Sequence, residues 1–151
     1  MQKIAVYCGS NFGESKAYFD AAQELGQLLA EQQLGLVYGG GKVGLMGTVA
    51  DAVLAAGGHV TGVIPTFLRE MEKAHTGLSE LIETPDMTVR KQKMIALADG
   101  YIAMPGGVGT FEEWFEVLSM AQLQLQQKPI GLLDIEGFYQ PLLRLIEQTI
   151  A

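Results

Sequence analysis

The sequence has little of several features that direct a protein to particular compartments or partners. Cys8 is the only cysteine among 151 residues, so no disulfide can form within the chain and a reducing compartment is the default expectation. Ten Lys and Arg stand against 17 Asp and Glu, which disfavours a general nucleic-acid-binding surface. No signal peptide precedes the first predicted strand, and no apolar run approaches the roughly 20 residues of a membrane helix. We therefore predict a cytoplasmic protein whose partners include neither a membrane nor a nucleic acid.

The sequence also lacks complete signatures for metals and common cofactors. His59 and His75 do not have the spacing of metal ligands. The Gly-x-Gly-x-x-Gly pattern at 39–44 matches the dinucleotide fingerprint, but the following strand ends at 63–66 in Val-Ile-Pro-Thr, without the acid that would hold the ribose. No glycine-rich turn continues into the Gly-Lys-Ser or Gly-Lys-Thr of a P-loop. We therefore expect neither a metal nor a cofactor.

Strand and helix patterns alternate along the whole chain. Nearly half of the residues, 48%, are hydrophobic, as in chains that form a buried core. The polar segment 66–79 is predicted to be a short helix and a mobile loop. Strands are predicted at 3–8, 35–38, 59–64, 81–83, 101–104 and 129–133, and helices at 15–32, 45–56, 87–98, 110–126 and 138–150. This alternation predicts an α/β fold of one domain, 1–151, with a parallel sheet covered by helices on both faces.

One stretch, Met-Pro-Gly-Gly-Val-Gly-Thr-Phe-Glu-Glu at 104–113, joins a predicted strand directly to a helix. Its glycines, Gly106, Gly107 and Gly109, allow positive φ and leave no Cβ in the way of a bound group. Free backbone N–H groups at the helix start favour an anion such as phosphate. A second interpretation is purely local: Thr110 caps the helix and Glu113 reaches back to the Thr110 N–H, as in a capping box.

Three glycine-bearing turns follow predicted strands, at Gly9-Ser10, 39–41 and 106–109. Because ligands bind at the carboxyl ends of parallel strands, this clustering favours a nucleotide-like ligand. Arg90 and Lys91 lie near the start of the helix at 87–98, where cations cost a little stability. They form either a solvated basic face or a site in which the planar Arg90 fork binds phosphate or carboxylate. Glu72 is read by default as a solvated residue.

Four motifs together resemble the LOG (lonely guy) family, and the resemblance spans essentially the whole chain. They are Val-Tyr-Cys-Gly-Ser at 6–10, Val-Tyr-Gly-Gly-Gly-x-x-Gly-Leu-Met-Gly at 37–47, Met-x-x-Arg-Lys at 87–91 and Pro-Gly-Gly-x-Gly-Thr-x-x-Glu at 105–113. Family members are cytokinin riboside 5′-monophosphate phosphoribohydrolases, often mislabelled lysine decarboxylases. The resemblance implies a Rossmann-like three-layer fold, a homodimer or hexamer of dimers, and a site completed near the subunit interface. Members usually continue through another strand and helix, so this chain is expected to lack that C-terminal part.

The resemblance also implies roles for individual residues. Arg90 and Glu113 match the catalytic pair of the family. Matches to substrate-binding positions, together with the neighbouring glycine turns, give a predicted substrate-binding set of Glu72, Lys91, Gly106, Gly107, Val108, Gly109, Thr110, Ser119, Gly9, Ser10, Gly40 and Gly41. Ser119 is commonly Thr in relatives.

These residues can support hydrolysis of the N-glycosidic bond of a purine nucleoside 5′-monophosphate, which yields free base and ribose 5-phosphate. Such a reaction passes through a cation-like ribosyl centre, for which the Glu113 carboxylate is a natural electrostatic partner. The phosphate would bind to N–H groups at 106–110. Arg90 would hold the phosphate or ribose, or assist the departing base. Plain AMP and N6-prenylated AMP are not distinguished.

Two other classes of function remain open. A non-catalytic nucleotide or molybdenum-cofactor carrier would use the same phosphate cradle, although intact Arg90 and Glu113 argue against it. A pyridoxal-phosphate decarboxylase would require a Schiff-base lysine, and Lys42, Lys91 and Lys93 have no recognisable context for one.

Overall fold

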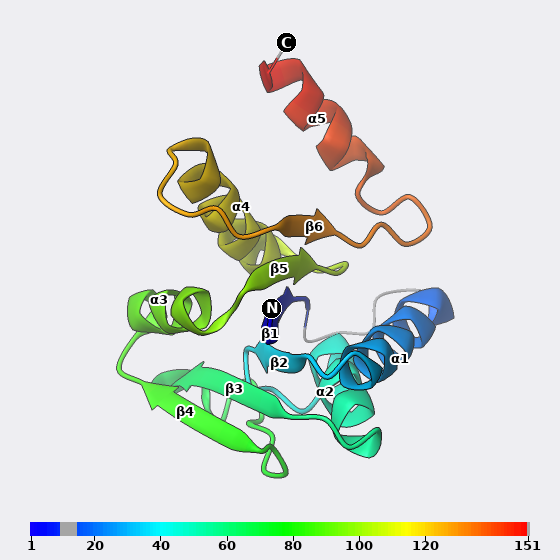
Figure 1. Cartoon of the computed structure of the whole chain (residues 1–151), viewed down its shortest axis with the longest axis vertical. Helices are drawn as coiled ribbons and strands as arrows, with labels where there is room; N and C mark the ends of the chain where they lie inside the picture. The colour runs from blue at the N-terminus through cyan, green and yellow to red at the C-terminus, as the bar shows by residue number, and fades with distance from the viewer. Residues whose placement is uncertain (10–14, 151) are drawn as a thin grey trace.

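The fold is built on one parallel sheet that runs through the middle of the molecule (Figure 1). The computed structural model describes residues 1–9 and 15–150, except for the side chain of residue 150. Among these residues six strands lie in the order β4-β3-β2-β1-β5-β6, and every neighbouring pair is parallel. The strands are β1 (Lys3–Tyr7), β2 (Gly35–Tyr38), β3 (Val60–Pro65), β4 (Glu80–Thr84), β5 (Gly100–Ala103) and β6 (Ile130–Leu132). The predicted α/β, Rossmann-like parallel sheet is confirmed.

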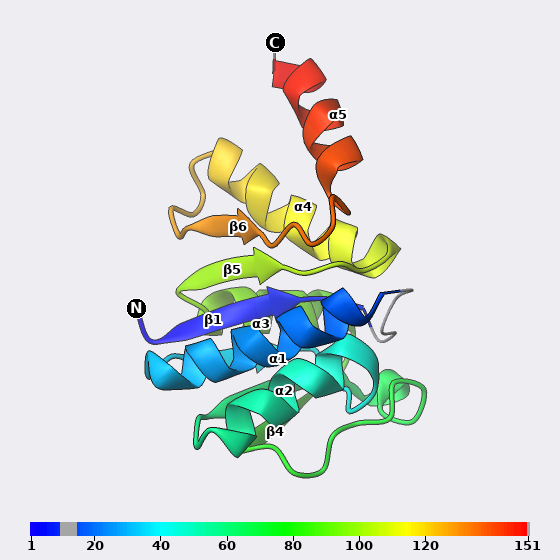
Figure 2. The same cartoon turned by 90° about the vertical axis from the view of Figure 1, so that its right-hand side faces the viewer.

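Helices cover both faces of the sheet (Figures 1 and 2). Buried residues of α1 (Lys16–Glu31) and α2 (Gly44–Ala55) form one apolar core with the sheet. Residues of α3 (Met87–Leu97) and α4 (Val108–Gln122) form a second core on the opposite face. The last helix, α5 (Gln140–Ile150), extends away from the sheet beyond β6 (Figure 2). The result is the three-layer arrangement that the alternating pattern predicts.

The central strand β1 shows why both faces are covered. Ile4 and Val6 belong to the core with α1 and α2, whereas Ala5 and Tyr7 belong to the core with α3 and α4. Successive side chains of a strand point to opposite faces, so an unbroken apolar strand needs an apolar partner on each side. The run of buried residues in β1 therefore places the strand inside the sheet, between β2 and β5.

The predicted elements exist, with shifts at their ends. The helix predicted at 110–126 begins two residues earlier, at Val108, and ends at Gln122. The helix predicted from 138 begins at Gln140. The segment predicted as a short helix and loop contains the 3-10 turn η1 (Thr66–Leu68), followed by hydrogen-bonded turns. That residues 1–151 form a single domain lacking a C-terminal strand and helix stays a prediction.

The structure also bears on the membrane question. In the part of the chain that the structure describes, every helix is too short or too polar to cross a bilayer. The cytoplasmic location stays a prediction.

Candidate active site

The three glycine turns meet at the carboxyl edge of the sheet, as the sequence predicts. The Gly9 N–H donates to the Pro105 carbonyl at 3.4 Å, and the Met46 N–H donates to the Gly9 carbonyl at 3.3 Å. A Cβ on Gly106 would lie only 3.0 Å from the Gly9 nitrogen. The turns after β1 and β5 and the start of α2 therefore form one continuous surface. Ser10 lies outside the described residues.

The turn before α4 differs from its prediction in backbone conformation. Gly106, Gly107 and Gly109 do not use positive φ; Gly107 is extended, with φ −111° and ψ −151°. The expectation of positive φ is wrong because the chain passes from strand to helix through extended backbone. Gly106 is required for close approach, since a Cβ there would lie 2.1 Å from Thr110 Oγ1. At Gly107 and Gly109 an added Cβ would meet nothing within 4 Å among the described residues, so open space lies over the helix start.

The predicted capping box is also wrong. The residue at the N-cap of α4 is Gly107, which makes no side-chain cap hydrogen bond, and Thr110 lies inside the first turn. Thr110 is 4% exposed and packs below the glycine turn. The side chain of Glu113 makes no hydrogen bond or ion pair with any residue that the structure describes, so its carboxylate does not serve as a cap. The structure therefore gives Glu113 no role in capping the helix.

The Glu113 carboxyl occupies an environment that disfavours its charge. Burial raises the pKa of Glu113 from 4.5 to about 7. The positive charge of Arg90 opposes this rise, while the carboxylates of Glu112 and Glu72 add to it. A carboxyl group with a pKa near neutrality can both release and accept a proton under physiological conditions, which is the property expected of an acid or base in catalysis.

Arg90 is buried, with only 3% of its surface exposed. Its Nε donates to the Val63 carbonyl at 2.9 Å, and its Nη2 donates to the Gly39 carbonyl at 2.7 Å. Nη2 also pairs with Glu72 Oε2 at 3.2 Å. The interpretations of Arg90 and Glu72 as solvated residues are both wrong, because α3 packs against the sheet and directs the guanidinium to the ends of β2 and β3. Gly39 makes room for it, since a Cβ there would lie 2.3 Å from Nη2.

The turn after β2 is held by the segment that carries Glu72. The His75 N–H donates to the Gly40 carbonyl at 2.8 Å, and Gly41 forms an antiparallel bridge with Ala74. Gly40 has φ +85°, a conformation that favours glycine. Gly40 and Gly41 are buried under this segment, so they place Glu72 next to Arg90. Their predicted contact with substrate stays a prediction.

Comparison with known proteins places the chain in a family. The family model described as "Possible lysine decarboxylase" matches residues 46–151. The probable cytokinin riboside 5′-monophosphate phosphoribohydrolase LOGL9 of Oryza sativa subsp. japonica is 45% identical over 150 residues, which cover 99% of this chain and 66% of the relative. LOG5 of Arabidopsis thaliana is 46% identical over 149 residues, which cover 99% and 65%. The chain belongs to the LOG family. It spans about 65% of the length of these two relatives.

Solved structures share the fold of this LOG family chain. The molybdenum cofactor binding protein of Rippkaea orientalis superposes with a TM-score of 0.74 at 24% identity, covering 97% of this chain and 85% of that chain. The molybdenum cofactor carrier protein of Chlamydomonas reinhardtii gives 0.74 at 20% identity, covering 98% and 84%. At these identities the likeness establishes the three-layer fold and nothing about the ligand.

Lys91 and Ser119 are two further positions predicted from the LOG family. Lys91 Nζ pairs with Glu112 at 2.5 Å and with Glu116 at 2.8 Å, and these hydrogen bonds raise the pKa of Lys91. The lysine thereby joins α3 to α4. Ser119 is exposed and lies nine residues after Thr110 along α4, roughly 13 Å at the helical rise. Substrate contacts of both residues stay predictions.

The sequence did not reveal the partners of these LOG family residues. Glu112 and Glu116 were not expected to hold Lys91, because the contact joins two separate helices. Met87 was also missed, although its Sδ lies 3.7 Å from Arg90 Nη1. The spacing of three residues between Met87 and Arg90 on one helix is a signal that could have found this contact.

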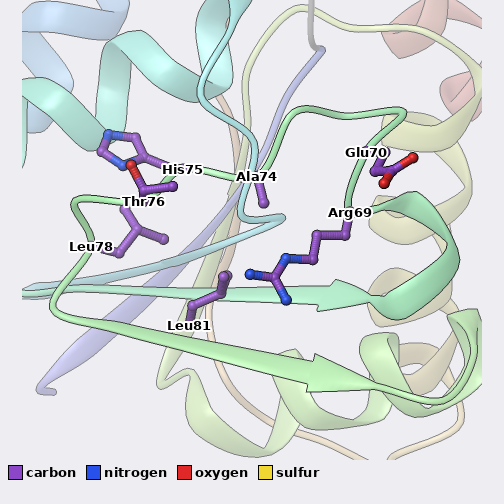
Figure 3. Close-up of a pocket in the computed structure, with 7 residues that line it drawn as sticks. All are labelled: Arg69, Glu70, Ala74, His75, Thr76, Leu78 and Leu81. Carbon is purple, nitrogen blue, oxygen red and sulfur yellow. The ribbon is translucent and has the colours of Figure 1, made fainter.

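A cleft of about 560 Å³ lies beside the segment that carries Glu72, and Figure 3 shows the side chains around it. Its lining comprises Arg69, Glu70, Ala74, His75, Thr76, Leu78 and Leu81. None of the predicted site residues lines it, and Arg69 is already paired with Glu83. The cleft is therefore separate from Arg90 and Glu113, whose catalytic roles stay a prediction. Over the described residues, no three His, Cys, Asp or Glu side chains group as metal ligands.

Proposed function

We propose that this chain hydrolyses the N-glycosidic bond of a purine nucleoside 5′-monophosphate, yielding free base and ribose 5-phosphate. The observation that carries the proposal is the Glu113 carboxyl, whose pKa is raised to about 7 beside buried Arg90. Membership of the LOG family supports it, since its curated relatives are named cytokinin riboside 5′-monophosphate phosphoribohydrolases. Adenine and N6-prenylated adenine are both candidate bases.

The proposed phosphate site is the start of α4. Gly107 makes no side-chain cap bond to the first helical N–H groups, so these donors are available to an anion. Val108 is 83% exposed, and no side chain of a described residue stands above Gly107 or Gly109. The helix dipole adds to the attraction for a phosphate dianion. Binding there anchors the 5′ end of the nucleotide, which brings its ribose toward Glu113.

In the proposed reaction the bond between ribose C1′ and the purine nitrogen breaks as water attacks C1′. The Glu113 carboxylate accepts a proton from the attacking water and stabilises positive charge on the ribosyl centre. The proton taken up by Glu113 passes, directly or through solvent, to the freed nitrogen of the departing base, which returns Glu113 to its carboxylate form. A carboxylate with a pKa near 7, like that of Glu113, suits this step. It is ionised at slightly alkaline pH and is still a strong proton acceptor.

The proposal includes a homodimer, or a higher assembly of dimers, that completes the site. Several large apolar side chains are exposed on α3, on α4 and just after α4: Met87, Phe115, Leu123 and Leu125. A second copy placed against these helices would cover them and bring another Ser119 toward the site. Light scattering at micromolar concentration should show at least a dimer. A monomer with full hydrolytic activity would contradict the composite site.

The direct test is chromatographic detection of free base from a panel of nucleotides. AMP and N6-prenylated AMP are compared with the corresponding nucleosides, which lack only the phosphate. At least one monophosphate should release base and ribose 5-phosphate, and its nucleoside should react at least about 100-fold more slowly because the anchoring contacts are lost. Absence of base release from every nucleotide would refute the proposed function. Equal turnover of nucleotide and nucleoside would refute the phosphate site.

Gly107→Val isolates the phosphate site within the same panel. Valine can adopt the extended backbone of this position, and its Cβ meets no described residue within 4 Å, so we expect a stability loss of at most about 1 kcal/mol. Its branched side chain would occupy the space over the helix start, so nucleotide binding should be abolished. A variant that still binds AMP like the wild type would place the phosphate elsewhere.

A further inference from the structure

The guanidinium of Arg90 is only partly satisfied by the fold. An arginine side chain carries five N–H donors. The Nε hydrogen goes to the Val63 carbonyl, and the two Nη2 hydrogens match the Gly39 carbonyl and Glu72 Oε2. Both Nη1 hydrogens remain without an oxygen acceptor among the described residues. Because Arg90 is 3% exposed, this is an unusual state for a buried charged group.

The one described partner of Nη1 is the thioether of Met87, at 3.7 Å. Met87 is the first residue of α3 and is 36% exposed. It lies three residues before Arg90, so the two side chains share one face of the helix. A thioether sulfur is a weak acceptor and a flexible, polarizable neighbour. Met87 therefore contacts Nη1 from one side but gives it no strong hydrogen-bond acceptor.

We propose that Met87 contacts Arg90 Nη1 without satisfying it, which leaves Nη1 available to donate a hydrogen bond to an oxygen of the nucleotide. A ligand oxygen that reaches Nη1 replaces a weak contact, so nearly all of the new charge-assisted hydrogen bond contributes to affinity. A strong acceptor in the place of the thioether would first have to be displaced. The inference rests on the proposed function, because it assumes that a nucleotide binds at this site.

Two substitutions of Met87 are predicted to act in opposite directions. Leu has a similar volume and no acceptor, so it leaves Nη1 wholly unpaired in the free protein, and AMP should bind about two- to fivefold more tightly. Gln has a similar length and a carboxamide oxygen that can accept a hydrogen bond from Nη1. AMP should therefore bind about tenfold more weakly, a loss of about 1.4 kcal/mol in binding free energy. A residue with a merely structural role would weaken binding in both variants.

The experiment is calorimetric titration of AMP into the Glu113→Gln protein, which should bind AMP without hydrolysing it, and into the same protein with Met87→Leu or Met87→Gln added. Melting temperatures confirm folding. Thr88→Gln is the matched control, since it adds the same amide to the next, exposed residue of α3, and its affinity should stay within about twofold. Titration with ribose 5-phosphate and with adenosine identifies which oxygen reaches Nη1. Ribose 5-phosphate keeps both the phosphate and the ribose oxygens of AMP, whereas adenosine keeps only the ribose oxygens. The Gln penalty should therefore persist for ribose 5-phosphate, and its absence there would overturn the inference. With adenosine the penalty should vanish if a phosphate oxygen reaches Nη1 and persist if a ribose oxygen does.

A second background shows whether Met87 acts through Arg90. In an Arg90→Lys protein the Nη1 donors are gone, so Met87→Gln should change the affinity for AMP by less than about twofold. A full tenfold penalty there, or parallel losses for Leu and Gln when Arg90 is present, would overturn the inference. These outcomes can be distinguished from failure of the proposed function. If the wild type hydrolyses nucleotides but Met87→Gln binds AMP normally, only the role of Met87 is refuted.

Discussion

Glu113→Gln is expected to reduce the release of free base by about 100-fold or more. Gln keeps the size of the side chain, and the carboxylate makes no hydrogen bond or ion pair with a described residue, so AMP binding should change little. In the proposed reaction the substitution removes both the negative charge that faces the ribosyl centre and the group that accepts a proton, and loss of such a contact typically costs at least this factor. Single-turnover assays with AMP measure the effect.

The pH dependence provides an independent check on Glu113. If the carboxylate is the active form, kcat/KM of the wild type should rise with pH up to about 7, the pKa to which burial raises this group, and level off above it. Below pH 7 the decline should approach tenfold per pH unit. The variant should lose this dependence along with its activity.

The same substitution should make the protein more stable at alkaline pH. Because the pKa of Glu113 is raised from 4.5 to about 7 in the folded state, the unfolded chain ionises first as pH rises. Stability present below pH 4.5 is therefore lost between about pH 4.5 and 7, by roughly 1.4 kcal/mol per pH unit at most. Gln does not ionise, so it brings no such loss of stability as pH rises. Urea unfolding should show Glu113→Gln to be more stable than the wild type at pH 8 and similar at pH 4.

Glu147→Gln on α5 is the matched control, because Glu147 is exposed and lies on the helix that extends away from the site. It should leave both the rate and the pH profile unchanged. Near-full activity of Glu113→Gln would instead mean that the catalytic carboxylate is Glu112, Glu116 or Glu72.

Arg90→Lys should lower both stability and catalysis strongly. A lysine retains the positive charge but has one ammonium group in place of the planar fork that reaches the Val63 and Gly39 carbonyls and Glu72. At least one buried acceptor would be left unpaired, so the free energy of unfolding should fall by about 2 to 4 kcal/mol. The segment that carries Glu72 would also lose its anchor, and kcat/KM should fall by about 100-fold or more.

Urea unfolding and AMP hydrolysis measured at a temperature where the variant is folded separate the two effects. Arg144→Lys makes the same exchange at an exposed position of α5, and its stability should stay within about 0.5 kcal/mol of the wild type. An Arg90→Lys protein with normal stability would show that the buried hydrogen bonds contribute little. One with normal kcat/KM would remove Arg90 from the catalytic pair.

Local patterns were sufficient to predict the architecture. The apolar strands separated by helical repeats predicted a parallel sheet with two covered faces, because side-chain periodicity is a property of neighbouring residues. The glycine turns at the strand ends likewise predicted which loops would lie together, while the ligand site itself stays a prediction. Parallel strands bring their carboxyl ends to one edge, so Gly9 and the turn at 106–109 had to meet once the sheet was known.

Tertiary structure alone decided the state of the two central side chains. From the local sequence, Arg90 is a cation near the N-terminal end of a helix, where the helix dipole disfavours it. In the structure its acceptors are the carbonyls of Val63 and Gly39, which are 27 and 51 residues away. Glu113 reads locally as part of a cap, but α4 begins at Val108, and the packing around its carboxyl raises the pKa to about 7. Desolvation and long-range hydrogen bonds depend on what surrounds a group in space. Periodicity along the chain could therefore predict where these residues lie but not their burial, their partners or the proton affinity of Glu113.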